Sequence, residues 1–136
     1  MVIALLGITS AVAVTKLGPS LQHGKVRGAA AVLVADLQYA QVVAARERRP
    51  VVVIVTPSTQ QYMIRDRETA AIVHRTRSLG QNSDYLLDEL TSTVSGLEVF
   101  PTGTTHAATT ITVGMGGYRR QVIFTRAGQI RVVPGS

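Results

Sequence analysis

The sequence predicts an α+β protein in which a long helical region at the N-terminus precedes an antiparallel β region. Up to Pro50, apolar residues either run without interruption or recur at spacings of three and four, the period of a helix. After Pro50, the apolar segments are short and are separated by Gly and Pro. Val, Ile and Thr make up 42 of the 136 residues, and these β-branched residues favour strands. One helix followed by several strands is an α+β arrangement.

The uncharged segment Met1–Val14 contains 11 apolar residues. As a helix it reaches about 21 Å, whereas the hydrocarbon core of a bilayer is about 30 Å thick. The basic start of a signal peptide is missing, and no face is polar as on a surface helix. We interpret the segment as a membrane span that lacks about six or seven residues, with a soluble core helix as the alternative. The residues assigned to this membrane and filament helix are Val2, Ile3, Leu5, Leu6, Gly7, Ile8, Val12 and Val14.

A kink or pause in the helix is expected at Gly18 and Pro19. We therefore divide the chain into a truncated hydrophobic N-terminal helix at residues 1–24 and a globular domain at residues 25–136.

The globular domain is expected to begin with an amphipathic helix over residues 25–49, which Pro50 ends. Gln38 and Gln41 are expected to face solvent. The apolar stripe of this helix consists of Val26, Ala30, Leu33, Leu37, Ala40 and Ala44.

Short strands are expected across the β region, residues 51–133. The apolar run Val51–Val55 lies between two prolines and predicts a central strand. Residues 85–90 are compatible with a helical turn or an edge strand, and both interpretations stay open. A turn at residues 126–128, with Gly128 in the left-handed conformation, suits a closing hairpin. The other expected strands are Gln60–Arg65, Ala70–Thr76, Leu97–Phe100, Thr109–Val113, Tyr118–Thr125 and Gln129–Val133, with a turn at Gly114–Gly117.

The sequence contains no arrangement of residues that would support catalysis. It has no Cys, which excludes disulfides, a thiol nucleophile and Cys-ligated zinc. Its three histidines, His23, His74 and His106, lie far apart in the sequence, and none has a second metal ligand at a suitable spacing. We therefore expect no enzyme activity, no metal, no cofactor and no small-molecule substrate.

The basic residues near the C-terminus are the candidate binding surface. The chain has 14 basic and 8 acidic residues, yet residues 99–136 contain four arginines and no acidic residue. The alternation of side chains along strands predicts that Arg119, Arg126 and Arg131 share one exposed face, with Arg120 beside it. Two interpretations stay open: arginines that bind the phosphates of DNA, and solvated charges that protect a sheet edge.

The order of these features resembles type IV pilin-like proteins, and in particular the GspH/FimT group of minor pseudopilins and minor pilins. The apolar start, with Gly7, resembles part of the pilin N-terminal helix. The segment "ADLQYAQVVAARERRP" (residues 35–50) is similar to the amphipathic helix of the group. The segment "VFPTGT" (residues 99–104) resembles its Phe-x-x-x-Gly turn, and "ITVGMGGYRRQVIFTRAGQIRV" (residues 111–132) resembles its closing strands.

The resemblance implies a non-enzymatic structural subunit of a type II secretion pseudopilus or a type IV pilus. Such a subunit is anchored in the bacterial inner membrane by a single helix, with its globular domain in the periplasm, and later packs against other pilins in a filament. The leader of the family and the Glu near its mature N-terminus are absent here, so the sequence shown is expected either to start at an internal Met of a longer reading frame or to be trimmed. Pro19 lies about one turn beyond the usual helix proline, so a kink is expected to be displaced.

Some FimT-type members bind DNA through a Gly-Arg-x-Arg segment in the last hairpin. The matching residues here run from Gly128 to Arg131, with Gln129 in place of the first Arg and Arg126 available from the turn. A DNA-binding minor pilin that serves DNA uptake is therefore the alternative function. A third hypothesis is an unrelated secreted binding domain behind a degraded signal peptide.

Overall fold

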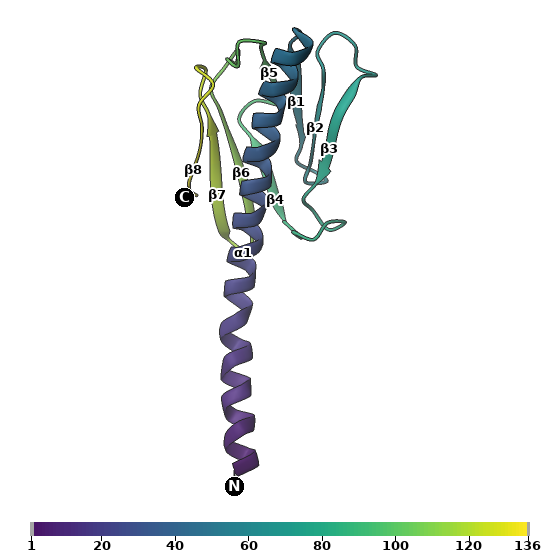
Figure 1. The fold of residues 1–136 in the computed structure, drawn as a ribbon. Helices are drawn as coiled ribbons and strands as arrows, with labels where there is room; N and C mark the ends of the chain where they lie inside the picture. The colour runs from purple at the N-terminus through teal and green to yellow at the C-terminus, as the bar shows by residue number, and fades with distance from the viewer. Residues whose placement is uncertain (1, 136) are drawn as a thin grey trace.

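The computed structural model describes the backbone of residues 2–135 and the side chains of residues 21–135. This part of the chain forms one helix, α1 (Val2–Glu47), followed by eight strands in two antiparallel sheets (Figure 1). The α+β class expected from the sequence is confirmed.

The first sheet has the strand order β3-β2-β1-β5, and each neighbouring pair is antiparallel. β1, the apolar run after Pro50, is an interior strand, as predicted. Its partner β2 was also predicted, whereas β3 lies a few residues later than expected. The strands of this sheet are β1 (Val51–Thr56), β2 (Gln61–Asp66), β3 (Val73–Ser78) and β5 (Gly96–Val99).

The second sheet has the order β4-β6-β7-β8 and is also antiparallel throughout. Residues 85–90 were compatible with either a helical turn or an edge strand. They lead into an edge strand, in which Leu90 pairs with Val113. Gly114 and Met115 belong to a strand rather than to the predicted turn, which is formed by Gly116 and Gly117 at φ of 59° and 87°. The strands of this sheet are β4 (Glu89–Ser92), β6 (Thr109–Met115), β7 (Tyr118–Phe124) and β8 (Ile130–Pro134).

The turn between β7 and β8 has the predicted geometry. Gly128 has a φ of 95°, which only glycine adopts without strain. Its N–H donates to the carbonyl of Thr125 at 3.0 Å, and the N–H of Thr125 donates to the carbonyl of Gln129 at 2.9 Å. These bonds close the last hairpin.

α1 is continuous over 46 residues, about 69 Å of helix. It passes through Gly18 and Pro19 without interruption, so the expected pause is absent. The helix ends at Glu47 instead of residue 49, because Arg48 adopts a left-handed conformation with φ of 56°. The side chains predicted to form the membrane helix, from Val2 to Val14, lie outside the described residues, and the division of the chain at residue 24 stays a prediction.

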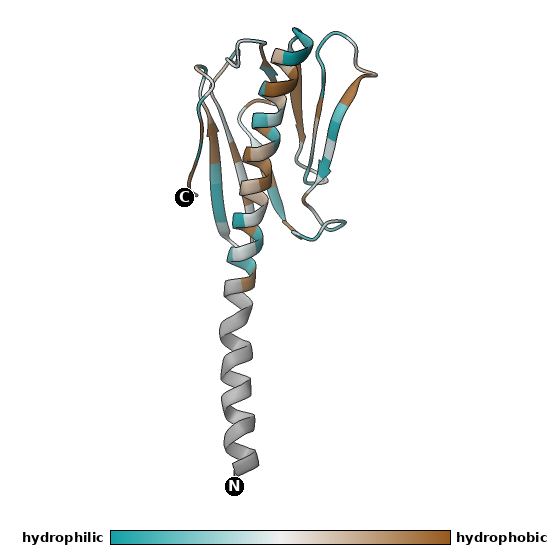
Figure 2. Ribbon diagram, viewed as in Figure 1, coloured by the Kyte–Doolittle hydropathy of each residue, from teal (hydrophilic) through white to brown (hydrophobic). Residues whose placement is uncertain are grey.

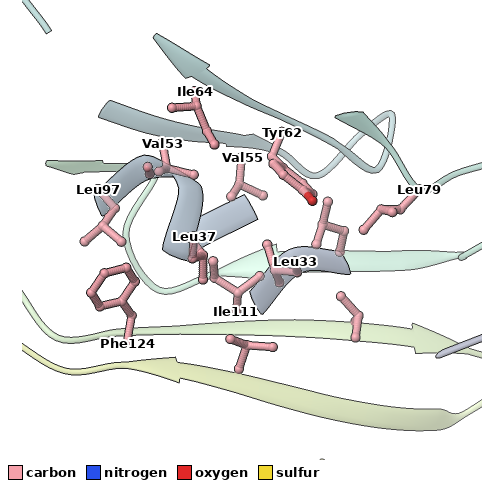
Figure 3. Close-up of a cluster of buried hydrophobic side chains, with 14 of the residues drawn as sticks. Leu33, Leu37, Val53, Val55, Tyr62, Ile64, Leu79, Leu97, Ile111 and Phe124 are labelled. Carbon is pink, nitrogen blue, oxygen red and sulfur yellow. The ribbon is translucent and has the colours of Figure 1, made fainter. Parts of the chain in front are cut away.

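The C-terminal part of α1 packs against both sheets and forms the centre of the core (Figures 1 and 2). Leu33 and Leu37 are fully buried among side chains of both sheets (Figure 3). All six residues of the predicted stripe are buried, which confirms the amphipathic helix. Residues 21–47 also have the length and hydropathy of a membrane helix, but their apolar face is occupied by the protein's own sheets. This part of α1 is therefore the core helix of the globular domain.

Replacement of Leu33 tests the helix packing. Leu33→Ala removes a side chain that is 0% exposed and is expected to lower the free energy of unfolding by about 2–5 kcal/mol. Val42→Ala is the matched control on the same helix: Val42 is 57% exposed, and its loss is expected to change stability by less than about 0.5 kcal/mol. Urea denaturation followed by circular dichroism measures both changes, and equal losses would contradict the packing described.

Candidate functional site

A buried carboxylate links α1 to the hairpin of β2 and β3. Asp36 is 1% exposed, although it lies on the core helix. Its oxygens accept hydrogen bonds from the Tyr62 hydroxyl, from Arg75 at 2.6 Å, and from Arg77 at 2.9 and 3.1 Å. The Arg75 guanidinium also lies over the Tyr39 ring, 4.2 Å from its centre. One helix residue is thus held by two strands more than 25 positions away in the chain.

The arginines keep Asp36 ionised. Burial alone would raise the pKa of Asp36, but hydrogen bonds from Arg77, Tyr62 and Arg75 lower it by more, so the pKa lies below its ordinary value. The pKa of Tyr62 is raised, first by burial and then by its bond to the carboxylate. The pKa of Arg77 is raised by its hydrogen bond to Asp36. The cluster is therefore a fixed ion pair with a neutral phenol, and it contains no group poised for proton transfer near neutral pH.

This cluster was not predicted from the sequence. A single Asp one position from the apolar stripe of α1 was the available signal, since a buried acid needs a cationic partner. Which cations supply the charge depends on tertiary structure, because Arg75 and Arg77 lie 39 and 41 residues further along the chain.

Gln41 contradicts the prediction that it faces solvent. Its side-chain amide donates to the carbonyl of Gly103 at 3.0 Å and to that of Gly128 at 2.8 Å. It is therefore half-buried and ties the loop after β5 and the β7–β8 turn to α1. Gln38, by contrast, is exposed as predicted.

The structure places Arg120 away from the predicted arginine face. Side chains alternate along β7, and Val122 and Phe124 are buried on the side that faces α1. Arg120 lies on that same side, is only half-exposed, and its Nε has no hydrogen-bond partner among the described residues. The expectation that Arg120 lies beside the other arginines is wrong, because the period of the strand assigns it to the helix side.

Arg119 is on the outer face, as expected, but it is engaged with an acidic residue. Its Nε donates to Glu89 at 2.6 Å, because β4 and β7 flank β6 and Gly114 leaves room between them. The surface around Arg119 is therefore not free of acidic side chains.

Arg131 and Arg126 are the remaining exposed arginines of this region. Arg131 pairs in register with Ile123, so it shares the outer face of the sheet with Arg119, roughly 13 Å further along β7. Arg126 is exposed in the β7–β8 turn. Within the described part of the chain, neither arginine forms an ion pair. Their role in binding stays a prediction.

Residues 21–135 contain no cluster of side chains that could hold a metal ion and no pocket for a small molecule.

Comparison with known proteins supplies the identity of the fold. The family described as type II transport protein GspH matches residues 29–128. The type IV minor pilin FimU of Pseudomonas aeruginosa has a TM-score of 0.66 at 22% identity, over 82% of this chain and 90% of the FimU chain. A second crystal form of FimU has a TM-score of 0.62 at the same identity, over 79% of this chain and 92% of the FimU chain.

The minor pseudopilin EpsH of the Vibrio cholerae type 2 secretion system has a TM-score of 0.64 at 13% identity. This match covers 81% of our chain and 97% of the EpsH chain. No curated protein sequence matches the chain.

The matched region covers most of the chain, so the chain belongs to the GspH family of type II transport proteins. It has the pilin-like fold and is a minor pilin or pseudopilin of a type II secretion system or a type IV pilus, as the resemblance implied. Its role is structural rather than enzymatic, and the family assembles with other pilins. The apolar N-terminal helix is consistent with a membrane-anchored pilin.

The Asp36 cluster makes stability depend on acidic pH. The pKa of Asp36 is lower in the folded than in the unfolded chain, so its contribution is complete above the unfolded value of about 3.9 and is lost as the pH falls through the folded value. We expect Asp36→Asn to lose about 2 kcal/mol at pH 7, less than for a fully buried pair because both arginines are over one-third exposed.

Urea denaturation of both proteins between about pH 5 and pH 2 tests this expectation. The difference in unfolding free energy between the wild type and Asp36→Asn should shrink as the pH falls. A difference that stays constant over this range would contradict an ionised Asp36.

Proposed function

We propose that the protein spans the bacterial inner membrane once, with its globular domain in the periplasm, and enters a pseudopilus or pilus by packing α1 among the helices of other subunits. The apolar segment before residue 15 supports this proposal, because it presents no polar face to water or to a sheet. Such a segment is compatible first with lipid and then with the apolar helices of neighbouring subunits.

The observation that carries the proposal is the outer face of α1, opposite the core. Its exposed positions from Gly24 to Ala45 follow a regular spacing of three and four residues. They are small or uncharged between Ala31 and Ala45, and Val42 is 57% exposed there. We name this set the outer helix face; its residues are Gly24, Arg27, Ala31, Ala35, Gln38, Val42 and Ala45.

Small residues at this spacing let a second helix approach closely. A surface that served only to keep the protein soluble would be expected to carry charges at such exposed helix positions. The charged residues of this helix end instead gather after Ala45, in Arg46 and Glu47, whose side chains are both exposed. The outer helix face is thus suited to contact with another helix along several turns.

Disulfide crosslinking tests this packing, because the chain has no Cys and an introduced Cys is then its single thiol. Ala35→Cys should crosslink, on mild oxidation in intact cells, to a partner pilin that carries one Cys in its N-terminal helix. Ala71→Cys, exposed between β2 and β3, is the matched control and should remain unlinked. Adducts are read on non-reducing gels; equal yields from the two positions would contradict the proposal.

DNA binding by the C-terminal hairpin is a second candidate function. The observation that favours it is that Arg126 and Arg131 are exposed in a region without acidic residues and form no ion pair with a described residue. Arginines in this state are available to DNA phosphates. Because Arg119 is engaged with Glu89 and Arg120 faces the helix side, the candidate surface is reduced to these two residues and the turn that joins them.

The double variant Arg126→Ala/Arg131→Ala should bind a short DNA duplex more weakly than the wild type. The slope of log affinity against log salt concentration should fall by about 1 to 2, since two phosphate contacts are lost. The matched control, Arg46→Ala/Arg67→Ala, removes the same charge from residues that pair with Glu47 and Glu98. Mobility shifts measure both, and equal behaviour of the two variants would contradict a specific DNA surface.

A further inference from the structure

The two sheets end in four edge strands, and three of them are protected against pairing with another chain. On β5, His106 occupies the edge. Its ring Nδ1 accepts a hydrogen bond from the backbone N–H of Glu98 at 3.1 Å, and its backbone N–H donates to the carbonyl of Glu98 at 3.3 Å. β4 has only four residues. β3 carries two arginines, and its register with β2 shifts between Ile64 and Arg65. Bulges, charges and short length are the usual means of blunting an edge.

β8 is the fourth edge, and its register shows which of its backbone groups are free. The N–H of Thr125 donates to the carbonyl of Gln129, and the N–H of Gly135 donates to the carbonyl of Arg119 at 3.0 Å. Hydrogen-bonded pairs alternate along an antiparallel ladder, so Arg131 and Val133 direct their N–H and C=O groups toward β7.

The alternate residues of β8 therefore direct their backbone groups away from the sheet. Ile130 and Val132 each present one N–H and one C=O, and Pro134 presents a C=O alone. Proline is tolerated on a free edge because no donor is needed there, which agrees with this assignment. β8 thus offers a regular hydrogen-bonding edge for a short incoming strand.

The side chains beside this edge differ on the two faces of the sheet. Ile130 and Val132 are in register with Phe124 and Val122, so they lie on the apolar side that faces α1. Val132 is nevertheless 37% exposed, which leaves apolar surface next to the edge. Arg131 is exposed on the opposite face, and Arg126 is exposed at the end of the hairpin.

We propose that the free edge of β8 pairs with an extended segment of another pilin subunit, in which aliphatic and acidic residues alternate. The aliphatic residues would extend the apolar side beside Ile130 and Val132, and the acidic ones would lie on the face of Arg131. A β8 strand from a second copy is a poorer match, because it would bring one Arg131 close to another. The choice of a pilin subunit as the partner rests on the proposed function in a pilus or pseudopilus.

The test uses a labelled synthetic peptide of alternating valine and glutamate and the full chain in detergent micelles. Fluorescence polarisation should show saturable binding. Val132→Pro removes a free N–H and is expected to weaken binding about tenfold or more, while the Tm stays close to that of the wild type. Val132→Thr retains the N–H and is the matched control, with binding near that of the wild type.

A second arm leaves the protein unchanged. N-methylation of alternate peptide residues on one edge should abolish binding, and methylation of the remaining residues should leave it intact. Binding that survives both Val132→Pro and all N-methylation, but is lost in Arg131→Ala, would reveal a general anion surface of the kind that DNA uses and would overturn strand pairing. Absence of peptide binding to the wild type would overturn it as well.

Since the peptide assay needs no filament, its failure is distinguishable from failure of the proposed function. Helix crosslinking at Ala35 can succeed while the peptide fails to bind, and this result would reject only the pairing at β8. Peptide binding without crosslinking would instead reject the helix packing.

Discussion

Burial of one face of α1 against both sheets is the constraint on which the rest of the structure depends. Leu33 and Leu37 lie between side chains of the first and the second sheet (Figure 3). The helix therefore forms the common core of two separate sheets. Because this face is filled by the protein itself, the opposite face of this part of the helix remains for other subunits. The same helix thus provides both the stability of the domain and the surface proposed for assembly.

Two polar contacts add specificity to this nonspecific apolar burial. Asp36 meets Tyr62, Arg75 and Arg77 in only one position of the helix, and Gln41 reaches two loop carbonyls near the second sheet. A shift of α1 by one turn would leave a buried carboxylate without its cations, which is strongly unfavourable. The cluster therefore fixes the position of the helix against the sheets. Gln41 does the same beside the β7–β8 turn.

The charged and uncharged surfaces of the protein have separate locations. The outer helix face is free of charge between Ala31 and Ala45, whereas Arg131 lies on the far face of the second sheet and Arg126 in its β7–β8 turn. This separation allows contact with helices on one side and with an acidic strand or a polyanion on the other. Membership in the GspH family agrees with the first surface, since such proteins act through contacts between subunits.

The sequence by itself determined the elements that depend on local patterns. The stripe from Val26 to Ala44 specified a helix because its residues recur every three or four positions, and Gly128 specified a hairpin because glycine alone adopts its φ freely. The order of these elements also led to the correct family. The pause expected at Pro19 does not occur, because the helical segments on both sides override a local preference for a break.

Only the tertiary structure decided which distant residues meet. Asp36 was visible as an acid beside an apolar stripe, but its arginines are on a strand whose register with β2 is irregular, so spacing could not identify them. Arg119 looked free because no acid follows Glu98, yet the order β4-β6-β7 brings Glu89 beside it. The free edge of β8 likewise exists only because of sheet order, since edges are defined by which strands pair and not by the strands themselves.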